Sequence, residues 1–150
     1  MERTERNRLR KKTAGVTYAV TALVSLILGG IYLLKTSFMP YHAEAISKGW
    51  RELEEPTQTL ISALMTVAGG GWFTAGVVIL ALLAIPFRRN ERWAVYAIPA
   101  VILLFYVPNL WATLTVLWKT PGTPPWYGNL LACISAIVGL IVYPKPLDIG

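Results

Sequence analysis

The chain has 150 residues, of which 55% are hydrophobic and only 15% are charged, and its mean hydropathy is +0.51. An apolar content this high, gathered in long blocks, excludes an ordinary cytoplasmic enzyme, a disordered chain and a disulfide scaffold, and it predicts an integral membrane protein. The formal net charge is +6. The basic residues lie at the ends of the apolar blocks, where they direct topology, so we predict no nucleic-acid binding.

Four apolar blocks follow one another along the chain, and none of them contains Asp, Glu, Lys, Arg or His. They cover residues 14–34, 60–85, 93–118 and 126–143. Backbone groups in lipid must be satisfied within a segment, so continuous blocks form helices, whereas barrel strands would show short alternating patterns. The sequence therefore predicts an all-α fold, a four-transmembrane-helix bundle that forms one integral membrane domain over residues 1–150.

Small side chains recur every four residues along the first block, at Thr17, Thr21, Ser25 and Gly29. The fourth block repeats this spacing with Gly128, Ala132 and Ala136, and with Ser135 and Gly139. Stripes of this kind let helix backbones approach closely, and we expect them to be contacts within the bundle. The alternative is that they dock against a partner protein.

A polar segment, residues 41–55, separates the first block from the second, with a proline on either side. Ile46, Trp50 and Leu53 recur in it at i, i+4 and i+7, which predicts one short amphipathic extracytoplasmic helix. We expect this helix to lie on the outer leaflet with Trp50 as its anchor.

Tyr41, His42 and Glu44 stand together at the start of this polar segment. A histidine and a carboxylate this close can relay a proton or orient a ligand. His42 is the only histidine and has no second strong ligand four residues on, so we predict no metal site.

The second block contains three consecutive glycines, residues 69–71, followed by Trp72. They permit very close approach, either by a neighbouring helix or by a flat apolar ligand. In the third block, Pro108 leaves a carbonyl free four residues earlier, and Asn109 follows it. Asn109 is costly to bury in lipid, so we expect it to face the bundle and to bond either a freed carbonyl or a ligand.

The remaining polar and aromatic groups of the blocks converge in the outer half of the bundle, beneath residues 41–55. This layout predicts a pocket with aromatic walls and few polar groups, the usual form of a small-molecule site. The candidate ligand-binding residues are Tyr41, His42, Glu44, Thr66, Trp72, Tyr106, Asn109, Trp111 and Asn129.

Basic residues are concentrated on one side of the predicted membrane. That side carries Arg3, Arg6, Arg8, Arg10, Lys11, Lys12, Arg88, Arg89, Arg92 and Lys145, and the other carries Lys35, Lys48, Arg51 and Lys119. The positive-inside rule places the first group in the cytoplasm. We therefore predict a multi-pass protein whose N- and C-termini are both cytoplasmic.

At residues 38–43 (FMPYHA), in the glycine-rich second block and at residues 106–109 (YVPN), the chain looks like a group of uncharacterised small bacterial four-helix membrane proteins. In overall plan it also resembles the DoxX-like superfamily, in helix count, in the extracytoplasmic segment after the first helix and in the glycines of the second. DoxX-like proteins are associated with redox or quinone-linked membrane complexes, and their relatives include cargo receptors. The resemblance implies a location in the bacterial cytoplasmic (inner) membrane and carries over no catalytic motif.

These patterns favour an accessory or binding protein for an apolar ligand, with a lipid or a quinone-like molecule as the candidate and no cofactor strongly implied. One alternative is a structural subunit or assembly partner of a larger membrane complex. Another is a membrane enzyme that uses His42 and Glu44 as acid and base, although we assign no catalytic residue because the sequence has few groups whose pKa can be tuned. The expected partners are the lipid bilayer, other membrane proteins or further copies of the chain.

Overall fold

The computed structural model describes residues 2–144, and within them the chain is helical and contains no strand. The α-helices are α1 (Glu2–Leu34), α2 (Pro40–Ile46), α3 (Glu55–Leu82), α4 (Ala94–Lys119) and α5 (Trp126–Val142). A 3-10 helix, η1 (Trp50–Glu52), precedes α3, and a π-helical turn, η2 (Leu83–Phe87), follows it. Lys145, which the sequence analysis assigned to the cytoplasmic side, lies outside the described residues.

Within residues 2–144, three helices are long and apolar enough to cross a membrane: α1, α3 with η2, and α4. The fourth predicted span corresponds to α5, which is apolar but only 17 residues long. The all-helical prediction is therefore confirmed for the described part of the chain, and three of the four predicted spans have the length and composition of membrane helices.

Two of the long helices begin earlier than the apolar blocks predicted. The first apolar block starts at residue 14, but α1 starts at Glu2 and includes the charged residues before that block. These residues are mostly Arg, Lys and Glu, which are good helix formers although they are not found in apolar blocks. At α3 the helix begins at Glu55 with Pro56 in its first turn, where a proline costs no hydrogen bond.

The prediction of a single amphipathic helix over residues 41–55 is wrong. The helix α2 ends at Ile46, because Ser47 adopts a left-handed backbone with φ 53° and the amides of Ser47 and Lys48 turn back onto the carbonyls of Glu44 and Ala43. This is the hydrogen-bond pattern of a helix terminus. The predicted apolar face is consequently divided between α2 and η1, and Trp50 packs edge-to-face on Phe38 with ring centroids 5.2 Å apart.

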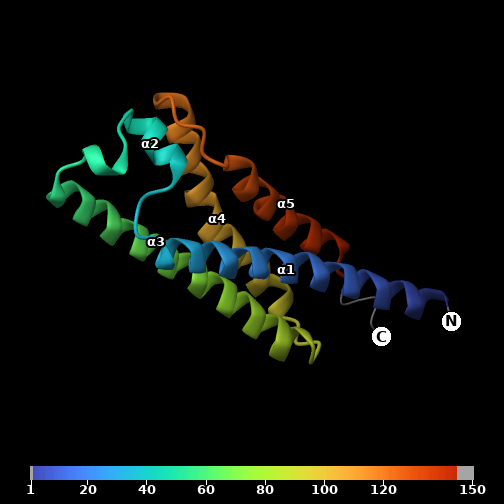
Figure 1. Cartoon of the computed structure of the whole chain (residues 1–150). Coiled ribbons are helices and arrows are strands. Elements are labelled where there is room, and N and C mark those ends of the chain that lie inside the picture. Colours follow the sequence, from blue (N-terminus) through green and yellow to red (C-terminus); the bar gives the residue numbers. More distant parts are fainter. Residues whose placement is uncertain (1, 145–150) are drawn as a thin grey trace.

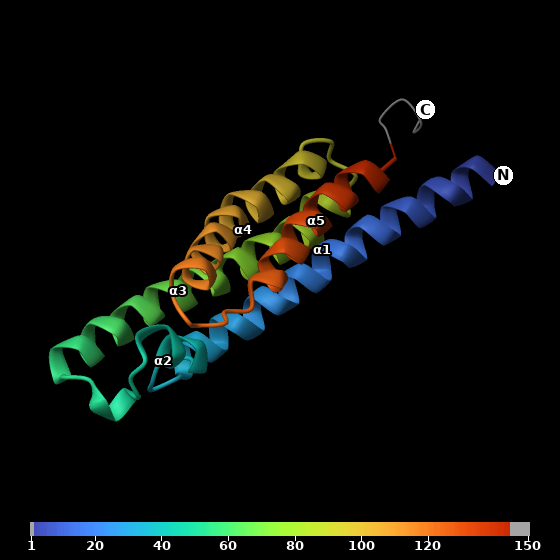
Figure 2. The ribbon, with the colours of Figure 1, turned by 90° about the horizontal axis from the view of Figure 1, so that it is seen from above.

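The long helices form two closely packed pairs, α1 with α3 and α4 with α5, and α1 also packs along α5. The contact between α3 and α4 is much smaller, because the two helices spread apart from the turn that joins them (Figure 1). We call the joined side, where η2 lies, the η2 end of the bundle, and the spread side, where α2 lies, the α2 end. The first turns of α1 project beyond the other helices at the η2 end (Figure 2).

The predicted small-residue stripes are contacts within the bundle. A Cβ added to Gly29 would come 2.6 Å from the backbone nitrogen of Phe73 on α3, and one added to Gly139 would come 2.4 Å from the ring of Tyr18 on α1. Thr21 bonds Ser135 of α5 through their hydroxyls at 2.8 Å. Both stripes therefore contact other helices of the same chain, except at Gly128, which is exposed and has no neighbour within 4 Å of an added Cβ.

Candidate functional site

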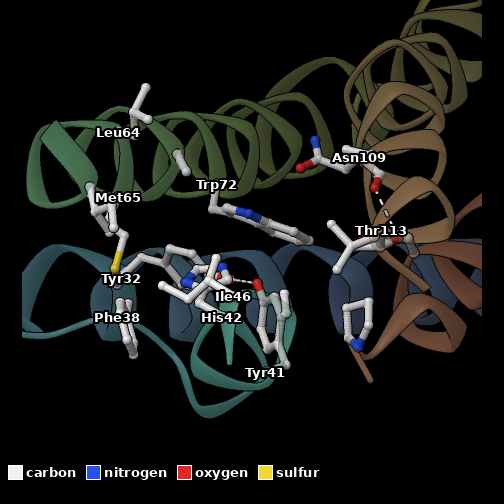
Figure 3. Close-up of a pocket in the computed structure, with 17 residues that line it drawn as sticks. Tyr32, Phe38, Tyr41, His42, Ile46, Leu64, Met65, Trp72, Asn109 and Thr113 are labelled. Carbon is white, nitrogen blue, oxygen red and sulfur yellow. Dashed lines mark hydrogen bonds between the residues drawn. The ribbon is translucent and has the colours of Figure 1, made fainter. Parts of the chain in front are cut away.

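A cavity of about 430 Å³ occupies the space between the spread helices at the α2 end. Its walls come from α1, α3, α4 and the first turns of α5, and α2 covers it (Figure 3). The lining residues are Tyr32, Phe38, Tyr41, His42, Ala45, Ile46, Ile61, Leu64, Met65, Ala68, Trp72, Asn109, Ala112, Thr113, Val116, Pro124 and Asn129. The volume lies in the range of about 300–1,000 Å³ that small-molecule sites occupy.

Trp72 forms the inner limit of the cavity, where its ring extends from α3 towards α4 (Figure 3). It is 8% exposed and packs edge-to-face on both Phe105 and Tyr106, with ring centroids 5.1 Å away in each case. Tyr106 itself is 1% exposed, and its hydroxyl lies 2.7 Å from that of Ser25. Tyr106 therefore supports Trp72 from behind and does not line the cavity.

Two amides and a hydroxyl form the polar part of the wall. Asn129 is 4% exposed, and its Nδ2 donates to the Thr113 hydroxyl at 3.2 Å. The Thr113 hydroxyl in turn donates to the backbone carbonyl of Asn109 at 3.0 Å. Asn109 Nδ2 donates to the carbonyl of Phe105 at 2.7 Å, one residue from the Leu104 carbonyl that the proline leaves free. Neither side-chain carbonyl oxygen receives a hydrogen bond from the residues that the structure describes, so both amides keep an acceptor for a ligand.

Tyr41 and His42 cover the cavity from α2. The hydroxyl of Tyr41 lies 2.5 Å from that of Tyr32 at the end of α1, and burial, followed by this bond, raises the pKa of Tyr41. His42 accepts the Met39 backbone N–H on Nδ1 at 3.3 Å, which places the proton of the neutral ring on Nε2. Burial lowers the pKa of His42 below 6.5, so the ring is a neutral donor at pH 7.

Glu44 does not face the cavity. It is exposed, and its carboxylate accepts the backbone N–H and the hydroxyl of Thr123 at 3.0 and 2.8 Å, which lowers its pKa. Its partner is thus the α4–α5 loop, and the suggested acid and base pair of His42 and Glu44 is not assembled. The helical rotation from residue 42 to residue 44 is about 200°, which explains the separation.

Thr66 and Trp111 also lie away from the cavity. Thr66 is exposed and bonds the Ser62 carbonyl of its own helix at 3.0 Å. Trp111 is 68% exposed and packs edge-to-face on Trp118 at a centroid distance of 6.4 Å. Each sits one or two positions from a residue that does line the cavity, Met65 or Asn109, and a rotation of about 100° per residue takes it to the outer face.

Several lining residues were not predicted from the sequence, although a signal for them existed. On α4 they follow Asn109 at helical spacing, as Ala112, Thr113 and Val116. On α3 they precede Trp72 with the same period, as Ile61, Met65 and Ala68. Extending the spacing i, i+3, i+4 and i+7 from the two residues already chosen would have found them.

Two of the three consecutive glycines of α3, Gly69 and Gly71, lie against neighbouring helices. A Cβ on Gly69 would come 2.9 Å from the Leu33 side chain of α1, and one on Gly71 would come 3.2 Å from the Phe105 ring. Helix contact therefore accounts for Gly69 and Gly71, whereas a Cβ added to Gly70 would meet nothing within 4 Å.

None of the seventeen residues that line the cavity is Asp, Glu, Lys or Arg. Between residues 2 and 144 no group of three His, Cys, Asp or Glu side chains is placed to hold a metal ion. The cavity therefore offers apolar surface with a few neutral donors and acceptors, an environment that suits an uncharged ligand.

No protein-family model matches the chain, and comparisons with curated proteins and with solved structures find no match either. The resemblance to DoxX-like proteins stays a prediction.

Proposed function

We propose that this small integral membrane protein binds an apolar ligand, a lipid or a quinone-like molecule, in the cavity at the α2 end. The observation that carries the proposal is the pair of amides at the cavity wall. Burying an amide in lipid is costly, yet Asn109 and Asn129 both line a mostly apolar cavity, and neither side-chain carbonyl oxygen accepts a hydrogen bond from residues 2–144. A ligand with a hydroxyl or another neutral donor would satisfy them, and the neutral His42 ring would donate to its oxygen.

The proposal includes four membrane spans, with α5 as the short fourth, and cytoplasmic termini in a bacterial inner membrane. The distribution of Lys and Arg supports this orientation, since the α1 start and the turn after η2 carry most of the basic residues and lie at the same end of the bundle. The α2 end then faces outwards, so the cavity lies in the outer half of the membrane.

The alternative role as an assembly partner has less support from the stripes that suggested it. Gly29 and Gly139 are buried against Phe73 and Tyr18 of the same chain, so neither is free to contact another protein. Binding to other membrane proteins, or to further copies of the chain, would have to use the exposed apolar faces.

Native mass spectrometry of protein purified gently from its own membranes tests the proposed function. We expect a bound lipid or quinone-like molecule at one copy per chain. Asn109→Leu removes a cavity amide at nearly constant volume and should raise the Kd for the ligand about tenfold, the effect of losing about one strong hydrogen bond, and so lower its occupancy.

Two threonines of α4 provide a matched pair for this experiment. Thr113→Val removes the hydroxyl that holds Asn129, whereas Thr115→Val removes an exposed hydroxyl that bonds only the Trp111 carbonyl of the same helix. We expect lower occupancy for the first variant and wild-type occupancy for the second. An empty wild-type chain, or equal occupancy in Asn109→Leu and wild type, would refute the proposal.

A further inference from the structure

The cavity is closed on the side of the membrane surface. The helix α2 is tied to α1 by the Tyr32–Tyr41 hydroxyl bond, and to the α4–α5 loop by the two hydrogen bonds between Glu44 and Thr123. Contact with this loop is also tight, since a Cβ on Gly122 would come 2.7 Å from the Tyr41 carbonyl oxygen. Entry from water would require these contacts to break.

The cavity is open sideways, between α3 and α4. Three of its lining residues are exposed, namely Ile46, Leu64 and Ala112, and they lie on α2, α3 and α4 respectively. We call these three residues the window. All are apolar, and Leu64 is 59% exposed. The ring of Trp72 meets that of Phe105 on α4, with centroids 5.1 Å apart, and α3 and α4 spread apart towards the α2 end (Figure 1). An apolar opening on the flank of a membrane bundle faces hydrocarbon.

Size and polarity then define what can occupy the site. A cavity of about 430 Å³ accommodates a molecule of drug size, which corresponds to a lipid head with the start of a chain and not to a whole membrane lipid. The neutral amides can accept a hydrogen bond from a hydroxyl group or donate one to a carbonyl group. No charged side chain lines the cavity, so the negative charge of a phosphate group would have no counter-charge there.

We infer that the cavity is entered from the outer leaflet through the window, and that its occupant is a lipid with an uncharged, oxygen-bearing head that lies at Asn109 and Asn129 while its chain stays in the bilayer. The inference rests on the proposed function and specifies its ligand class and route. Isoprenoid quinones and diacylglycerols share this chemistry.

Photocrosslinking in phosphatidylcholine vesicles measures where the parts of the lipid lie. The full chain is reconstituted with a diacylglycerol that carries a diazirine either beside the glycerol or at the end of one chain. We expect the diazirine beside the glycerol to label α4 and α5 around Asn109 and Asn129. The chain-end diazirine should label bilayer lipid and exposed residues near the window, such as Val67. Chain-end labelling of Trp72 in preference to these would overturn the inferred orientation.

Tryptophan substitutions test the route. Ala112→Trp obstructs the window and should lower labelling by the glycerol-side probe about tenfold, whereas Ala100→Trp, at an exposed alanine of the same helix away from the cavity, should leave it unchanged. Leu64→Trp obstructs the window from α3 and replaces Ala112→Trp in the test if that variant fails to fold.

A variant at the α2 side tests the alternative route. Thr123→Ala removes the hydroxyl that bonds Glu44 of α2 and should not change the labelling rate. Faster labelling in Thr123→Ala, together with wild-type labelling in both window variants, would assign entry to the α2 side and refute the inference.

Two further experiments test which lipid head group the cavity accepts. A phosphatidylglycerol probe with the same diazirine should label the cavity about tenfold less, because its charge would be buried without a partner. Equal labelling would overturn the requirement for an uncharged head. Displacement of the diacylglycerol probe by unlabelled ubiquinone or by unlabelled dioleoylglycerol distinguishes the two sources, and displacement by neither contradicts specific binding of this class.

The two proposals fail in different ways. An absence of cavity labelling in the wild-type chain with every probe, together with an empty chain in native mass spectrometry, refutes the proposed function. Wild-type labelling that both window variants leave unchanged refutes the route alone.

Discussion

The two ends of the bundle use similar apolar helices to opposite effect. At the η2 end α3 and α4 are joined by a short turn, and the rings of Tyr18, Phe87 and Tyr143 pack in sequence, with centroids 6.3 and 5.6 Å apart. At the α2 end the same two helices separate, and only the seven-residue α2 and the three-residue η1 connect α1 to α3. Close packing at one end therefore coexists with a cavity at the other.

The difference shows where a helical membrane protein of this size can hold a ligand. Small residues bring α1 against α3 along much of their length, whereas bulky rings stand between α3 and α4 at Trp72 and Phe105. A cavity forms where backbones are held apart and no side chain is long enough to fill the space. We expect substitutions at packed contacts to change stability, and substitutions at the cavity to change ligand occupancy.

The largest effect is expected at the contact between α1 and α3. A Cβ at Gly29 would come 2.6 Å from the Phe73 backbone nitrogen, whereas one at Gly30 would meet nothing within 4 Å. Gly29→Ala should lower the free energy of unfolding by about 1–3 kcal/mol, because the backbone must move. Gly30→Ala should leave it unchanged or raise it by up to about 1 kcal/mol, since alanine favours helix over glycine. Thermal unfolding in detergent measures both, and equal stability of the two variants would contradict the close contact.

A smaller effect is expected where the packed core meets the cavity. Tyr106→Phe removes the hydroxyl that bonds Ser25 at 2.7 Å behind Trp72. The free energy of unfolding should fall by about 0.5–1.5 kcal/mol, and by less if the Ser25 hydroxyl keeps its bond to the Thr21 carbonyl. Tyr127→Phe, at a tyrosine that is 61% exposed, is the control and should be neutral. A greater loss in Tyr127→Phe would indicate that Tyr106 is not part of the buried core.

The smallest effect concerns pH and the α2 end alone. Burial lowers the pKa of His42 from 6.5, so the unfolded chain takes up a proton at a higher pH than the folded chain does. The stabilisation by the neutral ring is complete above pH 6.5 and is lost as pH falls below that value. Hydrogen exchange of the α2 amides should therefore accelerate on going from about pH 7.5 to about pH 5.5, after correction for intrinsic exchange rates. The variant His42→Gln should lack this acceleration, and an identical pH profile in wild type and variant would exclude His42 as its source.

The apolar blocks were sufficient to predict helices because lipid leaves the backbone no other way to satisfy its hydrogen bonds. They could not predict that α1 extends to Glu2, since a polar helix end carries no hydrophobic signal. The break after Ile46 was missed for a related reason: the spacing of Ile46, Trp50 and Leu53 fits one helix, but the left-handed Ser47 between them depends on backbone bonds that no periodicity reports.

The structure brings five of the nine candidate residues to one cavity, namely Tyr41, His42, Trp72, Asn109 and Asn129. Tyr106 lies behind Trp72. Glu44, Thr66 and Trp111 are close to cavity residues along the chain but lie elsewhere, because neighbouring positions on a helix point in different directions. Residues that are close in sequence lie on the same turn of a helix, but they do not all lie on the same face of it.

Sequence alone thus determined the helical class, the membrane character and the uncharged chemistry of the interior, since each follows from composition and from the cost of burying charge in lipid. Only the tertiary structure decided where α3 and α4 separate and which helix faces line the cavity between them. It also decided that α2 covers this cavity and that the side of the cavity between α3 and α4 stays open. These features depend on contacts between residues far apart in the chain, such as Glu44 with Thr123 and Trp72 with Phe105, which fix the relative positions of helices in space.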